Sequence, residues 1–154
     1  MKKLLITAVI ATMFSIAAFA DGGKKATTDE GVTYAALNQF KTDFKSADDV
    51  MWAVTPNCQK VSFTQNNVDY TAFYSFDGDY LGITQNVSYK RMPSAVKKEI
   101  AKEYKGYEVN SVIKYKTHGA DEPVVYFVDL KNTAKEIVLK VTPDRSVTFF
   151  KEVK

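Results

Sequence analysis

The alternation of apolar and polar positions predicts a helix and four strands in the first half of this chain. Apolar side chains recur at helical spacing in Ala36, Leu37, Phe40 and Phe44, and Thr33 is a suitable N-cap. Strand-like runs follow at residues 50–54, 60–64, 70–76 and 80–87. Turn-forming residues, Gln65-Asn66-Asn67 and Asp77-Gly78, separate the second run from the third and the third from the fourth.

The second half shows the same order of elements. Met92-Pro93-Ser94 opens a helix, because proline is tolerated in a first helical turn, and Gly106 ends it. Val96, Ile100 and Tyr104 form the apolar stripe of that helix. Four more strand-like runs follow at residues 107–116, 124–131, 136–142 and 146–153.

The repeated order indicates an internal duplication. The links between strands are too short for parallel crossovers, so each half is expected to be an antiparallel meander. The predicted fold class is α+β, a tandem repeat of a helix plus a four-stranded antiparallel meander. We expect one domain over residues 32–154, with halves at about 32–91 and 92–154, after a flexible leader at 21–31.

The first twenty residues have the pattern of an export signal. Lys2 and Lys3 precede an uncharged apolar run, and Ala18-Phe19-Ala20 provides the small residues that signal peptidase requires. We therefore expect residues 1–20 to be a signal peptide cleaved after Ala20, and the mature protein to be periplasmic or secreted. The alternative is an uncleaved anchor, but the run is marginal against the roughly 20 apolar residues of a spanning helix. The mature chain has no second apolar run of that length, so it is not expected to be membrane-embedded.

Charge argues against nucleic acid as a partner. Loss of Lys2 and Lys3 with the signal lowers the formal net charge from +3 to +1. A balance this close to neutral lacks the basic footprint of a protein that binds phosphate backbones.

Reactive side chains are scarce. Cys58 is the only cysteine and His118 the only histidine, and the chain has no nucleophile-elbow, zinc-protease or phosphate-loop motif. A thiol enzyme that uses Cys58, with His118 as its base, is the alternative to a packed cysteine and a solvated loop histidine. Asp77-Gly78-Asp79 is better explained as a hairpin turn than as a calcium loop. We predict no catalytic residue, no cofactor and no metal site.

Aromatic residues are abundant in the strand-like runs, at 13% of the chain. Alternation places Tyr70 and Tyr74 on one face of their strand and Phe73 on the other. An open sheet face rich in tyrosine offers large contact area at small entropic cost. The hypothesis is a protein-binding face, and the alternative is that the rings fill a core. The face is predicted to include five residues: Trp52, Tyr70, Tyr74, Tyr80 and Tyr126.

Several short stretches resemble one family of exported Bacteroidetes proteins, the beta-lactamase-inhibitor-like, PepSY-like proteins. The similar stretches are Met92-Pro93-Ser94-Ala95-Val96 with Ile100, Tyr104 to Val109, Phe44 with Val50-Met51-Trp52, Phe76 to Leu81, and Tyr126 to Leu130. The chain departs from that family at Lys45-Ser46, where proline is common, at Tyr80, where tryptophan is common, and at Arg145, where glycine is usual.

The resemblance implies a tandem helix-plus-sheet fold with a concave sheet surface, which in the inhibitor proteins grips an enzyme. It supplies no catalytic residue. We expect an exported, non-enzymatic binding module that inhibits or regulates another envelope or secreted protein. The alternatives are a periplasmic protein that binds a peptide, sugar or lipid, and the thiol enzyme.

Overall fold

The computed structural model describes residues 31–118 and 124–153, so the predicted signal peptide and most of the leader lie outside the described residues. The first helix and sheet are α2 (Tyr34–Asp43), β1 (Asp48–Val54), β2 (Gln59–Gln65), β3 (Val68–Tyr74) and β4 (Tyr80–Asn86). A short 3₁₀ turn, η2 (Tyr89–Arg91), and α3 (Ser94–Glu103) follow. The last strands are β5 (Glu108–Thr117), β6 (Val125–Lys131), β7 (Glu136–Val141) and β8 (Val147–Val153).

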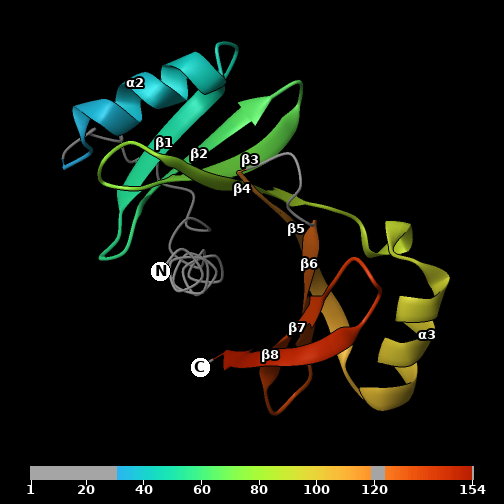
Figure 1. The fold of residues 1–154 in the computed structure, drawn as a ribbon. Helices are drawn as coiled ribbons and strands as arrows, with labels where there is room; N and C mark the ends of the chain where they lie inside the picture. Colours follow the sequence, from blue (N-terminus) through green and yellow to red (C-terminus); the bar gives the residue numbers. More distant parts are fainter. Residues whose placement is uncertain (1–30, 119–123, 154) are drawn as a thin grey trace. The chain divides into compact units, whose positions relative to one another are not determined.

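Strands that are neighbours in the chain pair antiparallel: β1 with β2 and β2 with β3 in the first half, and β5 with β6, β6 with β7 and β7 with β8 in the second (Figure 1). With the two helices, this confirms the α+β class. The chain divides into two compact units, one ending at Ile83 and the other beginning at Thr84. Neither helix in the described part of the chain is long and apolar enough to cross a bilayer.

Turn chemistry sets the register of the first hairpins. Asn66 and Asn67 both adopt left-handed conformations, with φ of 52° and 59°, as a two-residue hairpin turn requires. The third strand ends two residues earlier than predicted, because β3 ends at Tyr74. Ser75 N–H donates to the Asp79 carbonyl and Gly78 N–H donates to the Ser75 carbonyl, so Phe76 lies in the turn and is exposed. The predicted strand over residues 70–76 is corrected accordingly.

The core of the first unit lies between α2 and one face of β1–β4. Ala36 and Phe40 of the helix are buried against Trp52, Val61, Phe63, Ala72 and Tyr74 of the strands. The Phe40 ring lies 5.2 Å from the Phe63 ring and 5.5 Å from the Trp52 ring, both edge-on. Edge-to-face pairs of this kind add about 1 kcal/mol each beyond burial of their area.

A buried amide fixes the start of α2. The Thr33 side chain accepts from Ala36 N–H as the predicted N-cap. The Gln59 side chain is fully buried; its Oε1 accepts from Thr33 N–H at 2.6 Å, and its Nε2 donates to Thr33 Oγ1 at 3.0 Å and to the Ser75 carbonyl at 2.8 Å. One side chain of β2 therefore satisfies polar groups of the helix start and of the β3–β4 turn.

The β3–β4 turn also meets α2 directly. Gly78 is buried with φ of +90°, and a Cβ placed on it would lie 2.7 Å from the Ala35 Cβ and 2.8 Å from the Ala35 backbone carbon. Only glycine fits this conformation and this spacing together.

The core of the second unit lies between α3 and the strands β5–β7. Val96 and Ile100 of α3 are buried with Val112, Val128, Leu130 and Leu139 of the strands. Pro93 precedes the first helical residue and occupies the N-cap position, rather than the predicted first turn. Gly106 follows the helix with φ of +82°, as expected of a C-terminal stop.

The close approach of Gly78 to α2 leads to a stability prediction. Gly78→Ala should lower the free energy of unfolding by about 3 kcal/mol, because it adds backbone strain and a clash with Ala35. Gly31→Ala is the matched control in the same unit: its φ is +84°, but the added Cβ meets only Val54 Cγ2, at 3.7 Å. We expect that control to cost about 1 kcal/mol. Urea titrations followed by tryptophan fluorescence measure both, and equal losses would contradict the close contact.

Candidate functional site

The five residues predicted to form a binding face lie in or against the hydrophobic cores of the two units. Trp52 and Tyr74 are 7% and 0% exposed and belong to the core beneath α2. Tyr70 and Tyr80 are half-buried and pack against the same core. Tyr126 is half-buried against the core of the second unit. Burial therefore contradicts the predicted open face at Trp52 and Tyr74, where the core-filling alternative holds, whereas Tyr70, Tyr80 and Tyr126 keep part of their surface exposed.

Tyr74 has a clear structural role at the far end of α2. Its hydroxyl donates to Asp43 Oδ2 at 3.1 Å, which links β3 to the last residue of the helix. Burial, together with the neighbouring Asp43 carboxylate, raises the pKa of Tyr74 far above its usual value. The hydroxyl consequently stays protonated and keeps its hydrogen bond at any pH near neutrality.

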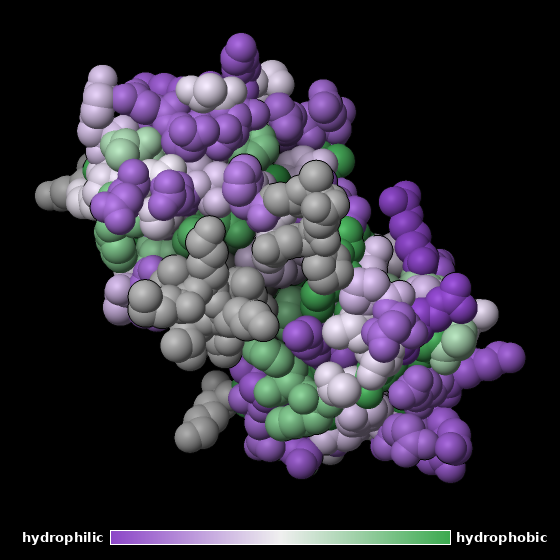
Figure 2. Space-filling model, viewed as in Figure 1, coloured by the Kyte–Doolittle hydropathy of each residue, from purple (hydrophilic) through white to green (hydrophobic). Residues whose placement is uncertain are grey.

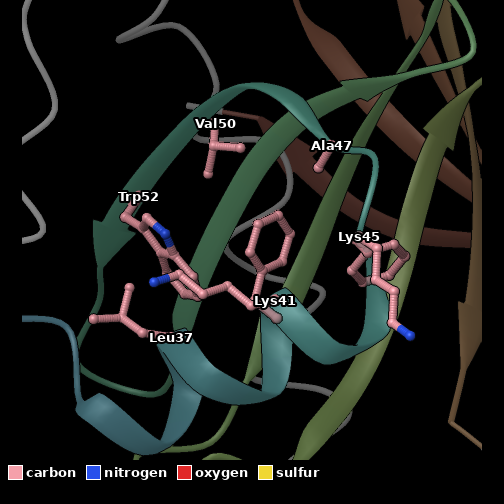
Figure 3. A pocket seen from close by; sticks show the side chains of 8 residues that line it. Leu37, Lys41, Lys45, Ala47, Val50 and Trp52 are labelled. Atoms are coloured by element: carbon pink, nitrogen blue, oxygen red, sulfur yellow. The ribbon is translucent and has the colours of Figure 1, made fainter.

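An open groove lies between α2 and β1 in the first unit. Its volume is about 560 Å³, and Figure 3 shows side chains from the helix and from the strand converging on it. The lining consists of Leu37, Phe40, Lys41, Phe44, Lys45, Ala47, Val50 and Trp52. The two lining residues from β1, Val50 and Trp52, are two positions apart, so they share the face of the strand that α2 covers. The groove is thus the part of the helix–sheet seam that opens at the side of β1.

The groove combines an apolar wall with positive charge. Lys41 and Lys45 are both exposed, and neither forms an ion pair with any described residue. In Figure 3 the Lys41 side chain extends toward Trp52, whereas the Lys45 side chain points away from the groove. No acidic residue lines the groove. The nearby Asp43 carboxylate instead accepts from Gln39 and Tyr74.

The strand that borders the groove is the edge of its sheet. Among the described residues, β1 pairs with β2 alone. Thr55 N–H donates to the Cys58 carbonyl at 2.9 Å, which marks a hydrogen-bonded pair next to the strand. Because such pairs alternate, Met51 and Ala53 direct their backbone groups toward β2, and Trp52 and Val54 direct theirs outward.

A β-bulge restricts the available edge. The register shifts between Asp48 and Met51, and Asp49 has a left-handed φ of 51°. Bulges and charged side chains at an edge oppose uncontrolled strand pairing. The straight part of the edge is therefore the segment from Met51 to Val54.

Cys58 is not placed for catalysis. Its side chain is fully buried, and the Thr55 hydroxyl lies 3.5 Å from its Sγ. His118, in contrast, is exposed beyond the end of β5. Among the described residues, no cluster of three His, Cys, Asp or Glu side chains could hold a metal ion.

Asp129 is the one buried carboxylate in the described strands. Its Oδ2 accepts from Asn110 at 2.7 Å and from Ser111 at 3.4 Å, and its Oδ1 has no hydrogen-bond partner among the described residues. Asn110 reaches it from a β-bulge in β5. Asp129 does not line the groove between α2 and β1, so we assign it a place in the sheet and not in the candidate site.

The outward surfaces of the helices provide little apolar area. Figure 2 shows mostly hydrophilic surface where α2 and α3 face the viewer. Tyr34, at the start of α2, is the main exception, at 78% exposed. The groove beside β1 is therefore the more suitable surface for recognition in the first unit.

A scan against protein-family models matches none of them, and a search of curated proteins finds no relative in sequence. Solved structures do match. A DUF2874 family protein from Bacteroides uniformis superposes with a TM-score of 0.69 at 17% identity, over 79% of this chain and 89% of that chain. A protein from Bacteroides eggerthii described as "putative periplasmic" has the same TM-score and the same two coverages, at 13% identity.

A BLIP-like protein from Bacteroides fragilis has a TM-score of 0.63 at 14% identity, over 86% of this chain and 91% of that chain. At these identities the likeness concerns the fold. It confirms that the chain has a BLIP-like fold, as the sequence resemblance implied.

The buried hydroxyl of Tyr74 predicts a loss of stability in alkali. Because its folded pKa lies above the unfolded value near 10, the folded state holds a proton that the unfolded state loses above about pH 10. The stabilisation that the Tyr74 hydroxyl provides is complete below about pH 10. Above that pH, the free energy of unfolding should fall by up to about 1.4 kcal/mol per pH unit. Tyr74→Phe should reduce that slope, and urea titrations from pH 8 to about 11 measure it.

The control for this experiment is Tyr89→Phe. Burial also raises the pKa of Tyr89, but its hydroxyl is not the one that contacts Asp43. An alkaline slope unchanged by Tyr74→Phe would show that the Tyr74 hydroxyl is not held protonated by the fold.

Proposed function

We propose that this protein is an exported, non-enzymatic binding module that inhibits or regulates another envelope or secreted protein. The observation that carries the proposal is the α2–β1 groove, where an apolar wall, two lysines without ion pairs among the described residues and an edge strand occur together. The surface offers hydrophobic contact, charge and backbone hydrogen-bonding groups to a partner. Buried Cys58 offers no exposed nucleophile.

The finer features of the proposal come from the sequence. We infer a signal peptide over residues 1–20, cleaved after Ala20, which would deliver the chain to the periplasm or beyond. We further infer that the domain over 32–154 arose by duplication of a PepSY-like unit, with halves at about 32–91 and 92–154. The order of elements and the likeness to a BLIP-like structure and to one described as "putative periplasmic" support this proposal.

A small-ligand function is the second candidate. The groove volume of about 560 Å³ lies in the range of small-molecule sites. An anionic amphiphile could place its tail against Leu37 and Trp52 and its charge beside Lys41. Such a ligand would leave the outward backbone groups of β1 unused, so the geometry favours a polypeptide partner.

Site-specific photocrosslinking tests the protein-binding proposal. A benzophenone side chain at Lys45, at the rim of the groove, should yield discrete adducts with a second polypeptide in envelope extracts. The same group at Lys98, an exposed lysine of α3, is the matched control and should not yield them. The captured polypeptide, once purified, should also change the fluorescence of Trp52. Identical adducts from both positions, or no fluorescence change, would contradict the proposed site.

A further inference from the structure

We propose that the groove receives an extended, acidic segment of the partner, which adds to β1 as an extra antiparallel or parallel strand. The segment would hydrogen-bond to the outward backbone groups of Trp52 and Val54. It would place one apolar side chain between α2 and β1 and a carboxylate beside Lys41. This inference rests on the proposed function and specifies the chemistry of its ligand.

The backbone argument comes from the edge. Trp52 and Val54 each direct one N–H and one C=O away from β2, and they are two residues apart. An added strand can hydrogen-bond to these outward N–H and C=O groups with its own backbone C=O and N–H groups. This pairing is the basis of recognition by β-strand addition. The bulge at Asp49 confines pairing to this short segment, and this limits both the register and the length of the ligand.

The groove supplies side-chain selectivity. A strand added about 4.8 Å from β1 turns every second side chain toward the helix side of the sheet. That side of β1 carries Val50 and Trp52, and Leu37 of α2 lies across the opening (Figure 3). An apolar side chain at this position would cover the remaining accessible edge of the Trp52 ring. Ligand residues on either side of it would face away from the groove and could be polar.

The charge argument selects an acidic segment. Lys41 lies at the last turn of α2 and extends along the groove toward Trp52 (Figure 3). Lys45 adds a second positive charge to the lining, and the lining contains no carboxylate. A basic ligand would therefore meet repulsion that nothing in the groove offsets, whereas a glutamate or aspartate would gain attraction.

Ligand binding in the groove can be followed by intrinsic fluorescence, because Trp52 is the only tryptophan of the chain and lines the groove. The probe is an acetylated and amidated seven-residue peptide with threonine at the odd positions, valine at the second and sixth positions and glutamate at the fourth, so that the glutamate shares a strand face with the valines. We expect saturable binding, measured by Trp52 fluorescence and calorimetry. Binding should weaken about threefold or more when the glutamate is replaced by glutamine, and it should weaken with added salt.

Backbone pairing is tested at Val54. Val54→Pro removes an outward N–H without removing a hydrogen bond to β2, as proline is tolerated on edge strands. It should weaken binding about tenfold or more, whereas Val54→Ala, which keeps the N–H, should weaken it little. Circular dichroism and the urea midpoint establish whether each variant is folded.

Charge selection is tested by exchanging the charges of Lys41 and of the peptide glutamate, an experiment that does not depend on the proline variant. Lys41→Glu should reject the glutamate peptide and accept a peptide with lysine in its place. Lys98→Glu makes the same charge change on α3 and should leave both affinities unchanged. Full recovery of binding in the swapped pair would support the placement of the carboxylate beside Lys41.

The outcomes separate this inference from the proposed function. If a partner crosslinks at Lys45 but Val54→Pro and Lys41→Glu bind peptide and partner like the native chain, the binding module stands and strand addition is overturned. If the glutamate peptide does not bind, or binds without a change in Trp52 fluorescence, the inference also fails. Equal binding of glutamate and lysine peptides would overturn the acidic selectivity.

Discussion

The placement of α2 on its sheet is the constraint on which the candidate site depends. Three contacts set it along the length of the helix. Gln59 holds the cap at Thr33, Gly78 allows the β3–β4 turn to touch Ala35, and Tyr74 holds Asp43 at the last residue. The contacts come from different strands or turns, so the helix has little freedom to slide or rotate without leaving a buried polar group unpaired.

A groove follows from that placement because the sheet ends at β1. Phe40 fills the middle of the helix–sheet seam, where strands continue on both sides. Within residues 31–118 and 124–153, no further strand lies beyond β1 to fill the space beside Leu37 and Trp52, so the seam opens. A surface built on a fixed helix and a paired strand is already formed before it meets a ligand. Binding to such a surface costs less conformational entropy than binding to loops.

The aromatic residues contribute to this surface indirectly. Trp52 and Tyr74 both contact the Phe40 ring edge-on, and Trp52 is only 7% exposed. A tyrosine-rich strand is therefore weak evidence for an interface, since the same residues are well suited to fill a small core under a helix. The charged residues at the rim, Lys41 and Lys45, are more informative about a partner.

Local sequence signals determined much of the fold. Periodicity located the two α-helices and eight strands of the part of the chain that the structure describes, because the spacing of apolar residues follows directly from the geometry of each element. Asn66-Asn67, Gly78 and Gly106 marked turns through their tolerance of positive φ. Phe76 was misassigned because an aromatic residue favours strands wherever it lies, while the turn hydrogen bonds of Ser75 and Asp79 end the strand before it.

Only the tertiary structure decided which face of the first sheet α2 covers. Alternation along a strand shows which residues share a face: Tyr70 and Tyr74 share one face of β3, and Trp52 lies on one face of β1. It does not show which of the two faces is buried. For the same reason the sequence could not show that Lys41 and Trp52 meet at an open edge. That meeting depends on β1 being the outermost strand and on contacts between residues as distant in the chain as Thr33 and Gln59.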